Sequence, residues 1–144
     1  MRSGKAKPQY QRGITLIEML VVLVILGLLG GLVGPAVLNQ LGGAKTKTAK
    51  LQIQDFEQAL EVYKLDVGRF PSGSEGLQAL VKKPGNAAGW NGPYLKKGSL
   101  PKDPWNRDYH YKSPGEHGDI DIFSYGEDGS PGGEGESADV TNWQ

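Results

Sequence analysis

The chain has 144 residues, of which 38% are hydrophobic, and its 16 Lys and Arg residues balance 16 Asp and Glu residues to a formal net charge of zero. This length allows one membrane segment and one small domain and excludes a second domain. The sequence contains no cysteine, which excludes disulfides and thiolate metal sites, and it has no basic patch on which nucleic-acid binding could rest.

The N-terminal region combines a basic leader with a long apolar run. Arg2, Lys5, Lys7 and Arg12 are the only charged residues among the first twelve. The uncharged run Met19–Leu38 would span, as a helix, roughly the 30 Å of bilayer hydrocarbon. Because positively charged flanks stay on the cytoplasmic side, we expect a single-pass segment with its N-terminus in the cytoplasm.

A secretory signal peptide has the same order of a basic and then an apolar region. Such a signal ends at small residues of the A-x-A kind. Here the run ends in Gly34–Leu38, and helical sequence continues beyond it. We therefore favour a retained membrane helix over removal of the whole apolar segment.

Glu18 stands at the edge of the apolar run. An unpaired carboxylate in that position costs about 2.5 to 3.5 kcal/mol on membrane-insertion scales. One interpretation is that Glu18 is functional and finds a partner inside the membrane. The other is that its side chain extends to the interface beside Arg12, and the position alone does not separate the two.

The segment Arg12–Glu18 resembles the class III leader of type IV pilins and pseudopilins. This resemblance implies that the prepilin peptidase cuts after Gly13, that the new N-terminus at Ile14 is methylated, and that Glu18 guides assembly. Pro35 falls where the family has its helix-kinking proline. The family usually has Phe at the position of Ile14.

Physical chemistry gives a separate reason for Glu18. Staggered packing of identical apolar helices would bury this carboxylate, and the free amine of Ile14 on a neighbouring subunit would be its best partner.

Removal of the leader takes away four basic residues and leaves 12 basic against 16 acidic residues, a net charge of −4.

The pattern after Gly42 and Gly43 is that of an amphipathic helix. Apolar residues recur at spacings of four and three, at Ala49, Ile53, Phe56, Leu60, Tyr63 and Val67. The spacing predicts a helix to about Val67, ended by Gly68, with its apolar stripe in the core against a sheet. A weaker helical pattern covers 75–82, and alternating residues predict strands at 109–112 and 119–125. Between them lies a region rich in turns, prolines and aromatic rings.

Four segments sharpen the resemblance: 92–95, 100–105, 125–129 and 138–143. Together with the leader they resemble the G-type major pseudopilins of type II secretion systems over nearly the whole chain. Ordinary type IV pilins usually carry a C-terminal disulfide loop, which this chain cannot form. The resemblance implies an α+β, pilin-like fold, with a long N-terminal helix packed on a small C-terminal antiparallel sheet that carries a calcium-type loop.

The segment from Asp119 to Asp139 holds seven carboxylates and no Lys or Arg. A hard divalent cation would relieve the repulsion between these charges, and oxygen ligands suit Ca²⁺. A solvated acidic tail explains the same composition equally well. The motif is not an EF-hand.

The resemblance favours Ca²⁺ over the acidic tail. The implied ligands are the side chains of Asp128 and Asp139 and the backbone carbonyls of Tyr125 and Ser130, with Ser137 as a further contributor. Glu134 and Glu136 stand where family members vary. An enzyme is not expected, because the only histidines are His110 and His117 and no G-x-S-x-G segment is present.

The expected organisation has three parts. Residues 1–13 form a cleaved cytoplasmic leader, residues 14–38 a transmembrane and assembly helix, and residues 39–144 a periplasmic globular domain. The preferred function is that of the major structural subunit of the type II secretion pseudopilus in the bacterial inner membrane. As a homopolymer, with minor pseudopilins and an inner-membrane assembly platform, it would form a periplasmic fibre that drives export of folded proteins across the outer membrane. A type IV pilus major pilin and a non-polymerising, membrane-anchored calcium-binding module are the alternatives.

Overall fold

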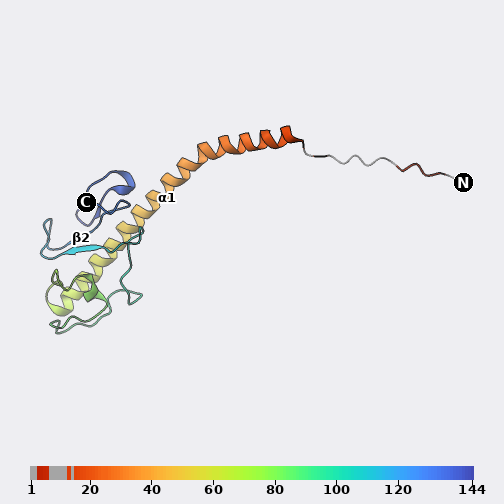
Figure 1. Ribbon diagram of the computed structural model, residues 1–144. Coiled ribbons are helices and arrows are strands. Elements are labelled where there is room, and N and C mark those ends of the chain that lie inside the picture. The colour runs from red at the N-terminus through yellow and green to blue at the C-terminus, as the bar shows by residue number, and fades with distance from the viewer. Residues whose placement is uncertain (1–2, 7–12, 14) are drawn as a thin grey trace. The chain divides into compact units, whose positions relative to one another are not determined.

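The computed structural model of the chain describes residues 3–6, 13 and 15–144 (Figure 1). The chain divides into two compact units, residues 1–39 and 40–144, and the helix α1 contributes to both. The elements in chain order are α1 (Leu16–Val67), η1 (Leu77–Leu80), β1 (His110–Lys112), β2 (Asp121–Ser124), η2 (Gly135–Ser137) and β3 (Val140–Thr141). One long helix and a small antiparallel sheet confirm the expected α+β fold.

Helix α1 is continuous over 52 residues, through Pro35 and through the glycine pair at Gly42 and Gly43. The change of sequence pattern at these glycines marks a change of environment and not a break in the helix. The helix ends where the sequence predicts, at Gly68, which adopts a φ of 89° and donates its N–H to the carbonyl of Lys64 at 2.7 Å. A glycine in this left-handed conformation is a common C-terminal cap.

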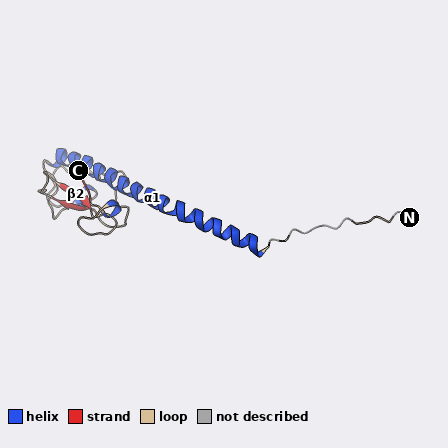
Figure 2. Cartoon of the chain, turned by 90° about the horizontal axis from the view of Figure 1, so that it is seen from above, coloured by secondary structure: helices blue, strands red, loops and turns tan. Residues whose placement is uncertain are grey.

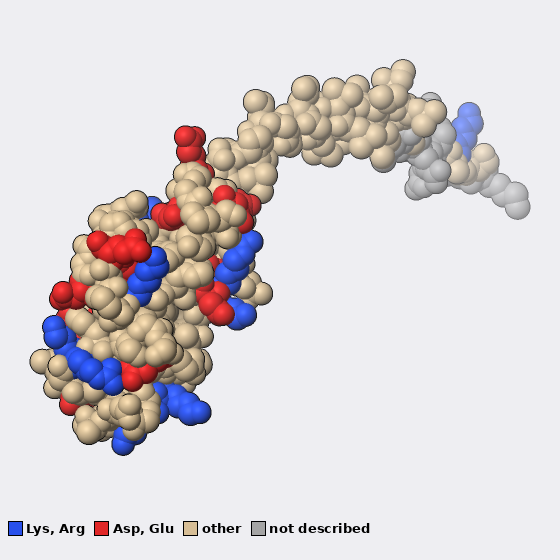
Figure 3. Space-filling view, turned by 60° about the vertical axis from the view of Figure 1, so that its left-hand side comes forward, with Lys and Arg blue, Asp and Glu red and all other residues tan. Residues whose placement is uncertain are grey.

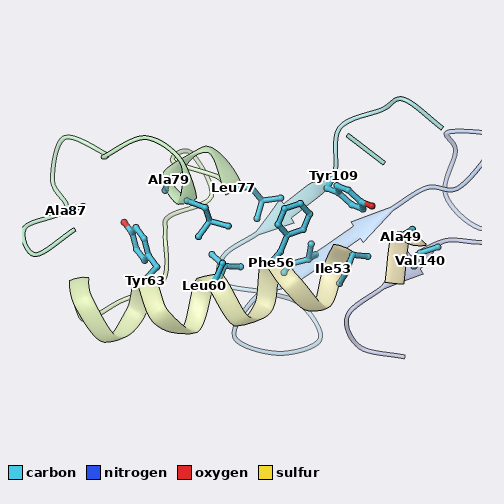
Figure 4. Close-up of a cluster of buried hydrophobic side chains, with 13 residues drawn as sticks. Ala49, Ile53, Phe56, Leu60, Tyr63, Leu77, Ala79, Ala87, Tyr109 and Val140 are labelled. Carbon is cyan, nitrogen blue, oxygen red and sulfur yellow. The ribbon is translucent and has the colours of Figure 1, made fainter. Parts of the chain in front are cut away.

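The core of the second unit lies along the predicted stripe of α1. Ile53, Phe56, Leu60 and Tyr63 are at most 1% exposed. Figure 4 shows these side chains on one face of the helix, pointing toward the side chains that cover it from η1 and the C-terminal half. Burial of each large apolar side chain contributes about 1.5–3 kcal/mol, so this face anchors the domain.

The sheet has the strand order β1-β2-β3, with both pairs antiparallel. Figures 1 and 2 place it beside the C-terminal part of α1. All four residues of β2 are buried, as expected of a central strand. The strands are shorter than the alternation predicted, and sequence reasoning missed β3, because a strand of two residues is too short to show a period.

Aromatic side chains organise the segment between η1 and β1. Trp90 donates its indole N–H to the carbonyl of Ala79 at 2.7 Å, and its ring lies edge-on to Tyr94 with the centroids 5.6 Å apart. The hydroxyl of Tyr94 donates to Asp66 near the end of α1 at 2.8 Å. These bonds confirm that packed rings, more than ladders, shape this region.

The helix expected at 75–82 is only the short 3₁₀ turn η1, which begins at Leu77. Ser72 and Glu75 do exchange the two bonds of a capping box, from Ser72 N–H to the Glu75 carboxylate and from Glu75 N–H to Ser72 Oγ. Gly76 follows with a φ of 63°, a conformation that no α-helix contains. The capping box therefore closes a turn and starts no α-helix.

Arg69 fixes the same turn by donating to both carboxylate oxygens of Glu75, at 2.8 and 2.9 Å. These bonds, followed by the N–H of Ser72, lower the pKa of Glu75 from 4.5 to about 2. A lowered pKa means that the ionised form stabilises the fold above about pH 4.5, and that this stability is lost as the pH falls toward 2.

We expect Glu75→Gln to unfold at a lower temperature than the wild type at neutral pH and to match it near pH 2. Because the Arg69 side chain is 41% exposed, salt should shrink the difference. Thermal melts of the detergent-solubilised protein between pH 2 and 7 measure this effect. Parallel curves for the two proteins over that range would contradict the assigned role of the pair.

Candidate functional site

The first candidate site is the apolar N-terminal half of α1. This segment is long and apolar enough to cross a membrane, and none of it is buried within the chain. Leu20, Leu23 and Leu32 are 61%, 65% and 76% exposed. In the space-filling view, charged side chains gather on the second unit (Figure 3). A stretch of exposed leucine, isoleucine and valine requires lipid or a protein partner around it.

The start of α1 is capped from within. Thr15 Oγ1 accepts a hydrogen bond from the N–H of Glu18 at 3.2 Å, and the carbonyl of Thr15 accepts from Met19 N–H. Glu18 lies in the first turn, where a negative charge interacts favourably with the helix dipole. Its side chain is exposed and is thus available to a group outside the chain.

Gly13 lies just before the helix, is exposed and has open space where a side chain would be. Ile14, the expected N-terminus after cleavage, lies outside the described residues, as does Arg12. Pro35 is inside α1, where the helix continues without interruption. Cleavage, methylation and the assembly roles of Glu18 and Pro35 stay predictions.

The second candidate site is the acidic loop, which we define as residues 126–139. Its two ends are joined by a bond of 3.0 Å from Glu127 N–H to the carbonyl of Glu136. Gly126 has a φ of 74°, and a Cβ there would lie 2.7 Å from the carbonyl oxygen of Ala138 and 2.8 Å from that of Glu136. Only glycine permits this close approach of the two arms.

The two predicted carboxylate ligands differ in their surroundings. Asp128 is exposed, and its Oδ1 accepts the N–H of Ser130 at 3.1 Å in a local turn. Asp139 is half-buried, and its Oδ2 accepts the N–H of Gly132 at 3.1 Å. The other oxygen of Asp139, Oδ1, is buried and has no hydrogen-bond partner among the described residues. A buried oxygen of this kind is costly unless a donor or a cation reaches it.

The backbone carbonyls suit the same role. Among the hydrogen bonds of the described residues, none ends on the carbonyl oxygen of Tyr125, Ser130 or Ser137. Over residues 3–6, 13 and 15–144, no group of three Asp, Glu, His or Cys side chains is placed to hold a metal. A cation here would therefore depend on two carboxylates and on carbonyls, a mixture that Ca²⁺ accepts. The buried, unpartnered Oδ1 of Asp139 is the feature of the loop that would suit such an ion.

The two glutamates of the loop lie in different places. Glu134 is exposed. The carboxylate of Glu136 lies directly over the backbone of Gly42 in α1, so a Cβ at position 42 would collide with it. Packing against Glu136 therefore explains why position 42 is a glycine. In the sequence this glycine appeared only as an interruption of the helical pattern.

Sequence reasoning missed the residues that connect the start of the loop to the rest of the domain by hydrogen bonds. The carboxylate of Asp103, which is 5% exposed, accepts the N–H groups of Trp105 and Arg107 at 3.0 and 2.8 Å and the hydroxyl of Ser124 at 2.7 Å. Ser124 Oγ in turn accepts the N–H of Gly126 at 3.2 Å. The Asp-Pro pair at 103–104 is a turn signal, but nothing in the spacing indicates its contact with Ser124.

A second network holds the C-terminus. Burial raises the pKa of Asp121, but the bonds from His117 and from the N–H groups of Glu116 and His117 outweigh burial, so that the pKa is lowered overall. The ring of His117 stacks on Trp143 with the centroids 3.9 Å apart. The histidine is therefore held at the surface between Asp121 and Trp143, with its side chain 44% exposed.

Known proteins match the chain over nearly its full length. The family described as "Type II secretion system (T2SS), protein G" matches residues 36–143, and the "Prokaryotic N-terminal methylation motif" matches residues 8–34. The Type II secretion system core protein G of Vibrio cholerae is 47% identical over 140 residues, which are 95% of this chain and 94% of the relative. That of Pseudomonas aeruginosa is 49% identical over 137 residues, 92% and 95% of the two chains.

A solved structure agrees with these relatives. The crystal structure of the major pseudopilin from the type 2 secretion system of enterohaemorrhagic Escherichia coli is 36% identical and superposes with a TM-score of 0.63. The match covers 72% of this chain and 87% of that chain. Sequence and fold thus favour the G-type pseudopilins over ordinary type IV pilins, and the chain belongs to the type II secretion system protein G family, the major pseudopilins.

Proposed function

We propose that this pseudopilin is the polymerising subunit of a periplasmic fibre that drives export of folded proteins across the outer membrane. The observation that carries the proposal is the exposed, apolar half of α1, in which the carboxylate of Glu18 is the one charged group. In the membrane this half is solvated by lipid, and in a fibre it packs against other copies. The subunit has a structural and not a catalytic role.

The topology follows from the same segment. The basic leader stays in the cytoplasm, and residues from about 39 onward lie in the periplasm. Assembly requires an inner-membrane platform, and minor pseudopilins share the exposed helix surface that copies of this chain use. Co-expression with such a machine tests the function: fibres containing this chain and restored secretion in a strain lacking its own G-type pseudopilin are expected. Secretion without any fibre would instead favour a non-polymerising module.

Processing is expected to remove the leader after Gly13 and to methylate Ile14. A glycine before the cut allows close approach of the peptidase to the backbone. Mass spectrometry of the protein purified from membranes should give a chain starting at Ile14 and heavier by one methyl group. Gly13→Ala should accumulate the uncut chain, and normal cutting of that variant would contradict the assigned cleavage site.

We further propose that the acidic loop binds Ca²⁺. Asp128 and Asp139 would provide carboxylates and Tyr125, Ser130 and Ser137 carbonyl oxygens, with the unpartnered Oδ1 of Asp139 as the main support. The bound ion would neutralise the carboxylates of the loop. It would also hold the loop in one conformation, which no disulfide can do in this chain. Ca²⁺ suits an irregular oxygen site better than Mg²⁺, which demands near-octahedral geometry.

Asp139→Asn is expected to weaken Ca²⁺ binding at least about tenfold, because the amide keeps the acceptor for Gly132 but loses the charge. The ion should stabilise the wild type by about 2.7 kcal/mol at a hundredfold excess over Kd, and a chelator should remove this gain. Calorimetric titration and melting curves of the detergent-solubilised chain measure both effects. Glu134→Gln, which removes an exposed charge of the same loop, is the matched control and should bind almost normally. A wild-type melting temperature indifferent to chelator would return the loop to a solvated acidic tail.

A further inference from the structure

Arg107 is held in place by its own backbone. Its N–H donates to Asp103 Oδ1 at 2.8 Å, and its carbonyl accepts the N–H of Asp103 at 2.8 Å. The buried Asp103 is fixed in turn by Ser124 at the end of β2. The backbone of Arg107 is therefore fixed, although the residue is exposed.

The guanidinium of Arg107 reaches the acidic loop. Its Nη1 donates to the carbonyls of Gly126 at 3.0 Å and of Glu127 at 2.8 Å. Gly129, which has a φ of 65°, packs on the guanidinium, since a Cβ there would lie 2.7 Å from Cζ. One cation thus contacts residues at both ends of 126–129, which we call the first arm of the loop.

These contacts of Arg107 do not engage the carboxylates of the loop. Arg107 bonds to backbone carbonyls and makes no described bond to Asp128 or Asp139. The first arm is bonded to the far end of the loop, because Glu127 N–H donates to the carbonyl of Glu136. A fixed first arm therefore also restrains that end. Arg107 therefore orders the backbone of the loop without occupying the carboxylates proposed for Ca²⁺.

We propose that Arg107 is the positioning residue of the acidic loop, which holds its first arm folded before any metal binds and so raises the affinity for Ca²⁺. Arg107 has two opposing effects on the affinity for Ca²⁺. Its positive charge repels the cation, but a loop that is already ordered loses less conformational entropy when the ion binds. The exposed charge is screened by water and salt, whereas the ordering of several glycine-rich residues is not. Preorganisation is the larger effect.

Hydrogen exchange of the full chain in detergent, with chelator present, tests the positioning role without any metal. Arg107→Gln should speed exchange of the amides of 126–129 about tenfold relative to those of β2, because the arm opens locally. Arg107→Lys keeps the charge but loses the flat guanidinium on which Gly129 packs, so we expect an intermediate rate. Lys102→Gln removes an exposed charge that is next to Asp103 in the sequence and has no hydrogen bond to the loop among the described residues. It is the matched control and should leave the rates unchanged.

The second measurement is the Kd for Ca²⁺ alone, and this arm rests on the proposed function of the loop. Arg107→Gln should bind about fivefold more weakly and Arg107→Lys about twofold, with Lys102→Gln unchanged. If the wild type binds no Ca²⁺, the calcium proposal fails, while the exchange data still decide the role of Arg107. Unchanged loop exchange in Arg107→Gln, equal loss of protection in loop and β2, or tighter Ca²⁺ binding would each overturn the inference.

Discussion

Glu18→Ala is expected to abolish fibre assembly while leaving the protein in the membrane. Alanine removes a carboxylate whose insertion costs about 2.5 to 3.5 kcal/mol, so the monomer should insert at least as well as the wild type. In the proposed fibre the carboxylate faces the amine of Ile14 on a neighbour. Charges 4 Å apart attract by about 4 kcal/mol at an effective dielectric constant of 20, which is enough to decide whether subunits dock.

Two variants separate charge from shape at this position. Glu18→Gln keeps the size and hydrogen-bonding capacity without the charge and should fail like alanine. Glu18→Asp keeps the charge with a shorter reach and should assemble partly. Fibre yield after shearing, compared with the amount of subunit in membranes, is the measurement. Normal fibres from Glu18→Ala would exclude charge pairing and favour a carboxylate that merely reaches the interface.

Gly126→Ala is expected to destabilise the second unit by about 3 kcal/mol. A left-handed conformation costs a residue with a Cβ roughly 1–2 kcal/mol. The new Cβ would also meet the carbonyl oxygens of Ala138 and Glu136 at 2.7 and 2.8 Å, and these belong to the backbone and cannot rotate away. The loop must open, which breaks the bonds from Arg107 and from Glu127 N–H. For a domain of about 100 residues this lowers the Tm by about 10–20 °C.

Gly132→Ala is the matched control in the same loop. Gly132 has a φ of 84°, but a Cβ there would meet nothing within 4 Å. Its substitution thus carries only the conformational cost of about 1–2 kcal/mol. The difference between the two Tm values, measured in chelator by thermal melts, reports the close approach of the two arms. Equal Tm values would show that the arms of the loop do not pack as described.

Sequence patterns alone predicted an apolar segment long enough to cross a membrane, the apolar stripe of α1 and the end of that helix at Gly68. These features follow from local rules, because hydropathy over twenty residues, a period of 3.6 and a glycine cap need no distant partner. Ile53, Phe56, Leu60 and Tyr63 are buried as their spacing predicts. The leader motif and the segments near the C-terminus also sufficed to indicate the family.

The contacts that hold the acidic loop could not be predicted from the sequence. Arg107 and Gly126 are 19 residues apart and Asp103 and Ser124 are 21 apart, so no local pattern relates the members of either pair. The collision of a Cβ at Gly42 with Glu136 depends in the same way on a helix and a loop that meet from opposite ends of the domain. Hydrogen bonds and close backbone contacts of this kind form only when folding brings distant segments together. They depend on the distance and angle between the two groups, and a local sequence pattern specifies neither.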